Sequence, residues 1–270
     1  MKPDASALPK PMPNEPEQTP GPVAGPDTPP SLPAATNRYI APIWHTLLIV
    51  ALILCNSFLG SSKVSAVGGH SSRILLYGGT IVTQFIFIVI IWFGIRSRGV
   101  RMREVIGGRW DTIEAFLLDV ALASLFYVVA ILVLFGLRVL LGTIDLHNLQ
   151  KTMDDTLKTL GPLAPHTYLE AGMFVLLSVC AGLVEEIIFR GYLQRQFSAM
   201  ANNAAAGIVA SGIIFGLGHG YQGPRLMVVI GVEGIFFGLL AHFRKSLRPG
   251  MIAHALQDSV AGIGLFRLVR

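Results

Sequence analysis

Long apolar runs without charge are the feature that most constrains this fold. Residues 39–62 contain no Asp, Glu, Lys or Arg, and similar runs recur along the rest of the chain. Because about 20 apolar residues are enough for a helix to cross a bilayer, each run predicts a membrane-spanning helix. Hydrophobic residues make up 52% of the sequence and charged residues only 14%, which excludes an ordinary soluble domain. The predicted fold class is all-α, a polytopic transmembrane helical bundle.

We expect about seven spans, with a range of six to eight because the charges after the last run fit the topology less well. The expected spans are Pro42–Gly60, Ile74–Ile95, one within Ile113–Leu141, Thr167–Val184, Ala204–Gly218, Leu226–Ala241 and Gly250–Leu265. The fourth is expected to continue as a helix to Phe197. Near the start of the third, Glu114 and Asp119 are expected to cap the helix or to snorkel toward water.

The chain is divided by composition into two parts. Residues 1–38 are polar and proline-rich, without an apolar centre, and predict a disordered tail. No internal repeat or long linker divides residues 39–270, so these are predicted to form one transmembrane domain.

Basic residues gather in short segments between the apolar runs. Five arginines lie between the second and third expected spans, and Arg244, Lys245 and Arg248 lie between the sixth and seventh. Since cytoplasmic loops carry an excess of Lys and Arg, both segments are predicted to be cytoplasmic, and so is the amino terminus. The expected location is the cell (plasma) membrane. Topology explains the net charge of +5, and no nucleic acid partner is expected.

Two adjacent glutamates follow the uncharged run 171–184. Glu186 and Arg190 are four residues apart and lie on one face of a helix, whereas Glu185 points about 100° away. This spacing predicts that Arg190 neutralises Glu186 in a structural ion pair and leaves Glu185 free for another task. Charges at membrane depth cost roughly 2.5 to 3.5 kcal/mol each, so they are functional candidates.

Ionisable side chains also interrupt the later apolar runs. His219 ends the fifth expected span, whereas His254 and Asp258 lie four residues apart on one helix face of the seventh. A single buried histidine is more often a satisfied core residue, but two histidines together with two carboxylates indicate a shared polar site. Glu233, in the sixth expected span, has two open interpretations: it pairs with a neighbouring helix, or it belongs to the site.

Such a set of groups suits the hydrolysis of a peptide bond. The reaction needs an activated water and a group that stabilises charge on the carbonyl oxygen. One divalent metal such as zinc, held by Glu185, His219 and His254, would leave a fourth position for the water. Without a metal cofactor, Glu185 and His219 would polarise the water and His254 would face the oxyanion. The residues leave both alternatives open.

Three ordered segments carry a family resemblance. They are Glu185-Glu186-x-x-Phe189-Arg190-Gly191-x-Leu193, Phe215-Gly216-Leu217-x-His219 and Ser246-Leu247-x-Pro249-Gly250-x-x-Ala253-His254-x-x-x-Asp258. Together they resemble the motifs of the CPBP family of intramembrane proteases, also called Abi, which includes the type II CAAX prenyl proteases. This family is often labelled metalloprotease. The resemblance covers roughly residues 171–258.

The resemblance implies an integral membrane endopeptidase with a protease-like core at about residues 167–265. Its implied substrates are membrane-associated peptides or proteins, of the prenylated CAAX type or bacteriocin-like. By this analogy Glu185 is the general base or a metal ligand and His219 shares the water. The candidate catalytic residues are Glu185, Glu186, His219, His254 and Asp258, with Arg190 as the ion-pair partner of Glu186.

One residue departs from the best-known members of the family, which have Asn where this chain has Asp258. An ionised Asp has no proton to donate to an oxyanion. The resemblance therefore implies that Asp258 acts in its protonated form, orients His254 or serves a metal.

Two other classes of function are compatible with buried charges. A non-enzymatic membrane scaffold or immunity protein would use the same fold to bind a partner. An ion or proton transporter would use the carboxylates as a relay, but the chain lacks the two halves with short broken helices that transporters often show. The protease is favoured because three ordered motifs match the family together.

Overall fold

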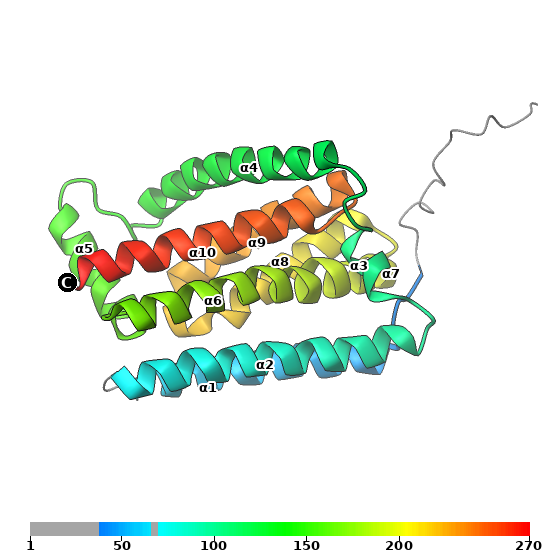
Figure 1. Ribbon diagram of the computed structural model, residues 1–270, viewed down its shortest axis with the longest axis horizontal. Coiled ribbons are helices and arrows are strands. Elements are labelled where there is room, and N and C mark those ends of the chain that lie inside the picture. The colour runs from blue at the N-terminus through cyan, green and yellow to red at the C-terminus, as the bar shows by residue number, and fades with distance from the viewer. Residues whose placement is uncertain (1–37, 66–69) are drawn as a thin grey trace, which may run out of the picture. The chain divides into compact units, whose positions relative to one another are not determined.

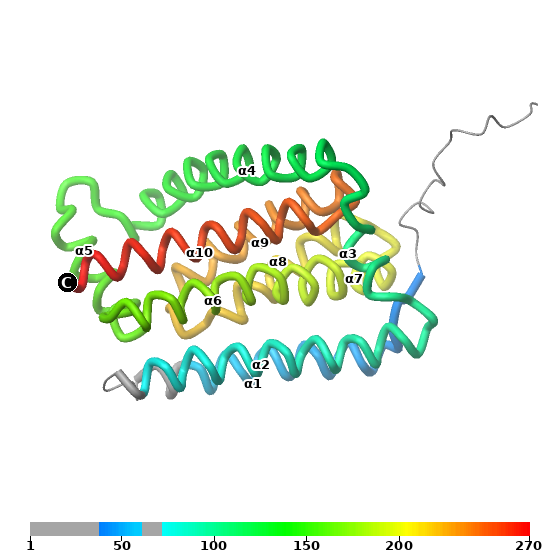
Figure 2. The backbone as a smooth tube through the Cα atoms, viewed as in Figure 1, coloured from blue at the N-terminus to red at the C-terminus, as the bar shows by residue number. Residues whose placement is uncertain are grey.

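The computed structural model describes residues 38–65 and 70–270, and these residues form a bundle of helices without a β-strand (Figures 1 and 2). The long helices are α1 (Ile43–Ser65), α2 (His70–Arg96), α4 (Ile113–Leu140), α6 (Tyr168–Glu185), α8 (Ala204–Gly218), α9 (Pro224–Arg244) and α10 (Arg248–Leu268). The shorter elements are α3 (Met102–Ile106), α5 (Leu149–Leu160), η1 (Gly161–Leu163), η2 (Glu186–Leu193), α7 (Gln194–Ala201) and η3 (Gly220–Gln222). The predicted all-α class is confirmed. The predicted tail, up to residue 37, lies outside the described residues.

The described helices have the composition of an integral membrane protein. Five segments are long and apolar enough to cross a bilayer: Ile43–Gly60, Ser72–Arg96, Ile113–Leu140, Tyr168–Ala201 and Pro224–Arg244. The two other expected spans correspond to α8, which is apolar but has only 15 residues, and to α10, which has 21 residues and carries charged side chains.

Helices α6 and α10 lie side by side at the centre of the bundle, between α2 and α4 (Figure 1). Two contacts show that they run antiparallel. Gly182 of α6 meets Ala255 of α10, and Phe174, earlier in α6, meets Gly262, later in α10. A Cβ atom on Gly182 would lie 2.5 Å from the backbone nitrogen of Ala255. Only glycine therefore permits this approach, as is usual where helices pack inside membranes.

Helices α8 and α9 form a second close pair, joined by the turn η3. A Cβ atom on Gly216 would lie 2.5 Å from the carbonyl oxygen of Met227, and one on Gly212 would lie 2.9 Å from the carbonyl oxygen of Gly231. The four helices that carry the candidate site residues are thus held at short backbone distances, which fixes the positions of their side chains.

The segments predicted to be cytoplasmic meet at one end of the bundle, here called the basic end. The backbone nitrogen of Leu247, between α9 and α10, donates to the carbonyl of Ile106 in α3 at 2.9 Å. Arg195 of α7 donates to two carbonyls of α3 at 3.0 and 3.1 Å. The side chain of Gln196 accepts hydrogen bonds from the backbone at residues 40–41, so the start of α1 lies here as well.

Asp119 differs from its expected place near the membrane surface. Its side chain is fully buried and accepts hydrogen bonds from Trp110 Nε1 at 2.8 Å and Arg244 Nε at 2.9 Å. Arg248 Nε lies 3.2 Å from Oδ2, the oxygen that also accepts from Trp110, whereas Arg244 binds Oδ1. We call these four residues the Asp119 cluster. Glu114, in contrast, is exposed in the first turn of α4. The cluster ties α4 to the turn between α9 and α10.

Candidate active site

The two glutamates lie where the regular α-helix α6 changes into the π-helix η2. All eight residues of η2 are buried, and the helix continues without a break into α7. Ser211 of α8 donates from its hydroxyl to the carbonyl of Phe189 at 2.7 Å and so anchors the wider turn. The sequence predicted a helix to Phe197 but not this change of helix type. Single π-turns inside α-helices occur frequently at functional sites.

Glu186 and Arg190 form a fully buried ion pair. Arg190 Nη1 donates to Glu186 Oε1 at 2.8 Å, and the two side chains are 1% and 0% exposed. The guanidinium also donates to the carbonyl of Gly234 at 3.1 Å and lies over the rings of Phe215 and Phe237, 4.4 and 5.0 Å from their centres. The charge of Arg190 is therefore balanced by a carboxylate, a carbonyl and aromatic faces.

His254 of α10 connects this ion pair to the second glutamate. Its Nδ1 donates to Glu186 Oε1 at 3.2 Å, which directs Nε2 to the other side. There Nε2 lies 3.9 Å from Glu185 Oε2 and 3.7 Å from Asp258 Oδ2. Both distances exceed a direct hydrogen bond, so two carboxylates approach one imidazole nitrogen without binding it.

Glu185 and Glu186 have opposite environments although they are neighbours in sequence. The side chain of Glu185 is 20% exposed, and that of Glu186 is fully buried. Glu185 Oε2 has no hydrogen-bond partner among the described residues. The structure therefore separates a carboxylate that is neutralised by Arg190 from one that is available to a substrate or a water.

His219 caps the end of α8 and has one fixed ring nitrogen. Its Nδ1 donates to the carbonyl of Phe215 at 2.9 Å, so Nε2 is the acceptor nitrogen when the ring is neutral. The ring of Phe215 lies against both imidazoles, with centroids 4.8 Å from His219 and 6.0 Å from His254. Ser57 of α1 donates to the carbonyl of Leu217 at 2.8 Å and so holds this turn in place.

Glu233 lies on α9 and contacts α10. Its Oε1 accepts a hydrogen bond from Gln257 of α10, and it lies within electrostatic range of His219, His254 and Arg190. Asp258 lies within the same range of both histidines and of Glu185. The hydrogen bond from Gln257 agrees with the first interpretation of Glu233, pairing with a neighbouring helix, and its place in the site stays a prediction. Sequence reasoning missed Gln257, since a neutral amide in an apolar helix gives no charge signal.

The metal alternative can be tested against the positions of these groups. A glutamate with two histidines is the donor set of an open zinc site, and each imidazole is oriented through its Nδ1 as metal-binding histidines usually are. Across residues 38–65 and 70–270, however, no three His, Cys, Asp or Glu side chains are grouped closely enough to hold a metal ion. The arrangement does not fit a metal site as it stands, and no catalytic step is derived through a metal.

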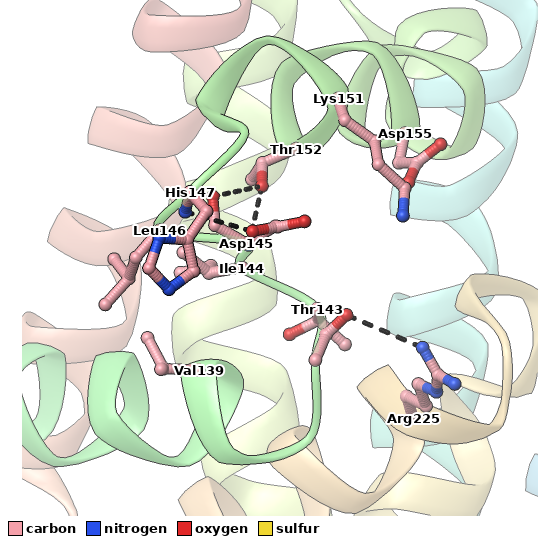
Figure 3. A pocket seen from close by; sticks show the side chains of 11 residues that line it. Val139, Thr143, Ile144, Asp145, Leu146, His147, Lys151, Thr152, Asp155 and Arg225 are labelled. Atoms are coloured by element: carbon pink, nitrogen blue, oxygen red, sulfur yellow. Dashed lines mark hydrogen bonds between the residues drawn. The ribbon is translucent and has the colours of Figure 1, made fainter.

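The pocket in Figure 3 is separate from this site. It has a volume of about 360 Å³ and lies between the end of α4, the loop at 142–148, α5 and Arg225 of α9. Its polar groups are used within the loop, where Asp145 N donates to Thr152 Oγ1 at 2.8 Å and His147 N donates to Asp145 Oδ1 at 3.0 Å. None of the candidate catalytic residues lines it.

Comparison with known proteins agrees with the motifs. Residues 167–260 match the family model described as type II CAAX prenyl endopeptidase Rce1-like, and this range includes every candidate site residue. Neither the curated proteins nor the solved structures gave a match. The predicted resemblance is confirmed over residues 167–260, where the chain is similar to the type II CAAX prenyl endopeptidase Rce1-like family.

Proposed function

We propose that this protein is an intramembrane endopeptidase that cleaves membrane-associated peptides or proteins with a water activated by Glu185 and His219. The similarity of residues 167–260 to this family supports peptidase activity in general. The specific proposal rests on one observation: the free oxygen of Glu185 and a carboxylate oxygen of Asp258 both lie within 3.9 Å of His254 Nε2 inside an apolar bundle. Prenylated CAAX-type peptides and bacteriocin-like peptides are the two substrate classes to test.

The geometry suggests a role for each group. Glu185, whose Oε2 has no hydrogen-bond partner among the described residues, takes a proton from the water as the water oxygen attacks the scissile carbonyl, and Nε2 of His219 helps to polarise that water. His254, held through Nδ1 by Glu186, donates from a protonated Nε2 to the oxyanion that forms. Glu185 then passes its proton to the leaving amine, and the Glu186–Arg190 pair keeps the imidazole in position.

The depth of the site supports cleavage inside the membrane. Helix α8 starts at the basic end and has 15 residues, so it is about 22 Å long, less than the ~30 Å of a hydrocarbon core. With the basic end at the membrane surface, this proposal puts His219, at the end of α8, inside the hydrocarbon core. We further propose that the basic end and the amino terminus face the cytoplasm at the plasma membrane, because the Lys- and Arg-rich segments meet there.

The decisive experiment is a cleavage screen of membrane-anchored peptides with purified protein and the variant Glu185→Gln. We expect this variant to lose on the order of 10²- to 10⁴-fold in cleavage rate, with an unchanged melting temperature. His219→Ala should lose activity as well. Glu114→Gln is the matched control, because it removes a carboxylate from an exposed position of α4 and should leave cleavage unchanged.

The other outcomes identify the alternatives. Full cleavage by Glu185→Gln would remove the role assigned to that residue. Cellular function that survives Glu185→Gln but is lost when helix packing is disrupted would favour a scaffold or immunity protein. Ion flux in proteoliposomes that depends on Glu185 would favour a transporter. Metal analysis of the same preparations completes the test, because stoichiometric zinc that disappears in Glu185→Ala would make this glutamate a ligand.

A further inference from the structure

A groove runs between α6 and α10 at the end of the bundle opposite the basic end. It has a volume of about 790 Å³, within the range of roughly 300 to 1,000 Å³ that is usual for small-molecule sites. Its walls are apolar and come from Ala171, Gly172 and Val175 of α6 and from Ile263 and Phe266 of α10. We call it the α6–α10 groove. None of the candidate catalytic residues lines it.

Two arginines close one end of the α6–α10 groove. The guanidinium of Arg270 lies over the rings of Tyr168 and Phe266, 4.8 and 5.1 Å from their centres, and Arg267 lines the groove one residue after Phe266. Neither arginine forms an ion pair with a carboxylate of the described residues. At the same end Arg73, by contrast, pairs with Glu170 at 3.1 Å.

We propose that the α6–α10 groove binds an anionic phospholipid, with an acyl chain along its apolar walls and the phosphate on Arg267 and Arg270. Arginine binds phosphate oxygens through two parallel hydrogen bonds, which suits an anion at the mouth of the groove. Tyr168 is 74% exposed at the start of α6, as expected for an aromatic side chain at the level of the lipid headgroups. Basic pockets between membrane helices on the cytoplasmic or matrix side bind anionic headgroups, and we propose the same chemistry for the opposite leaflet.

Charge complementarity favours a lipid over an apolar protein segment as the occupant. A purely apolar helix would cover the apolar walls of the groove but leave the two guanidinium groups without a counter-charge. An anionic phospholipid satisfies both parts of the groove at once. This inference does not depend on the proposed peptidase activity, because it involves the opposite end of the α6–α10 pair.

The test is lipid binding by the purified full-length protein in nanodiscs of phosphatidylcholine alone or mixed with phosphatidylglycerol, measured by native mass spectrometry of the retained lipid. We expect selective retention of phosphatidylglycerol by the wild type. The double variant Arg267→Gln/Arg270→Gln should weaken this binding by roughly 30-fold. The control Arg98→Gln/Arg103→Gln removes the same charge from exposed positions at the basic end and should retain the lipid.

A second variant tests the apolar wall without removing charge. A Cβ atom on Gly172 would meet nothing within 4 Å, so a side chain can start here without a clash, and Gly172→Leu is expected to fill the groove. It should weaken phosphatidylglycerol binding at least tenfold. Gly136→Leu, at an equally open position on α4, is the matched control and should have no effect.

Four results would overturn the proposal. The first is equal retention of phosphatidylcholine and phosphatidylglycerol by the wild type. The second is undiminished phosphatidylglycerol binding in both groove variants. The third is a dimer that Gly172→Leu dissociates without loss of lipid, which would assign the groove to a second copy of the chain. Competition by inorganic phosphate alone at similar concentration would likewise exclude a contribution from the acyl chain.

Discussion

The Asp119 cluster and the surroundings of Glu185 are two buried carboxylate sites that are built in opposite ways. Asp119 is fully buried and has three partners, Trp110, Arg244 and Arg248, at 2.8 to 3.2 Å. Glu185 is 20% exposed, its Oε2 has no hydrogen-bond partner among the described residues, and the nearest imidazole nitrogen is 3.9 Å away. Because buried polar groups are normally satisfied, the saturated site indicates a structural role and the unsaturated one indicates chemistry.

The Asp119 cluster also helps to hold the groups around Glu185 in position. Arg248 is the first residue of α10, and the same helix carries His254 six residues later. The Asp119 cluster therefore fixes the start of the helix that brings the imidazole to Glu185. Glu186 differs from both sites, since Arg190 and His254 bind its Oε1 while its Oε2 has no hydrogen-bond partner among the described residues.

We expect the largest loss of stability when Arg190 is replaced. Arg190→Ala leaves Glu186 as a buried charge without its cation, and loss of one partner of a buried pair costs roughly 3 to 5 kcal/mol. Thermal unfolding in detergent should show a large fall in melting temperature. The control Arg103→Ala removes an exposed guanidinium from α3 and should change stability by less than about 0.5 kcal/mol.

A second variant separates the charge from the packing at this position. Glu186→Gln combined with Arg190→Met removes both charges together and keeps an oxygen acceptor for His254 Nδ1. We expect it to be more stable than Arg190→Ala, because replacing both partners leaves no buried ion. If Arg190→Ala alone were as stable as the wild type, the buried ion pair would not hold Glu186 in place.

The next effect is expected at Asp119. Asp119→Ala removes the acceptor of three donors and should destabilise the protein by roughly 3 kcal/mol. The cost is smaller than at Arg190 because Arg244 and Arg248 are 28% and 11% exposed and can reach water. Chemical denaturation is the measurement, with Asp111→Ala in the exposed loop as control. An unchanged denaturation midpoint would mean that this cluster does not hold α10 in place.

The sequence predicted much of this arrangement because charges in apolar helices stand out. The spacing of Glu186 and Arg190 indicated their pairing, and the runs without charge indicated the helices. Two features could not be read in the same way. The π-helix η2 depends on contacts from α8, such as that of Ser211, and has no residue pattern of its own. Asp119 resembles an end-of-helix residue until the partners from α9 and α10 are known.

Gln257 provides an intermediate case between the two kinds of site. It donates a hydrogen bond to the buried carboxylate of Glu233. Gln257→Leu should cost roughly 1 to 3 kcal/mol, because it leaves a buried carboxylate without that hydrogen bond. The cleavage rate per folded molecule should fall less in Gln257→Leu than in Glu185→Gln. A loss of cleavage as large as that of Glu185→Gln, at unchanged stability, would place Gln257 among the reacting groups.

The smallest effect is expected at Asp258, where the comparison can be sharpened. Its side chain is 36% exposed and lies 3.7 Å from His254 Nε2, so Asp258→Asn should leave the melting temperature almost unchanged. We expect cleavage to stay within about tenfold of the wild type or to increase, since an amide can donate to an oxyanion and a carboxylate cannot. Asp258→Leu, which has similar bulk and no polar atom, should be clearly less active. If Asp258→Asn were as inactive as Asp258→Leu, the negative charge itself would be required, and Asp258 would act on His254 or on a metal and not on the oxyanion.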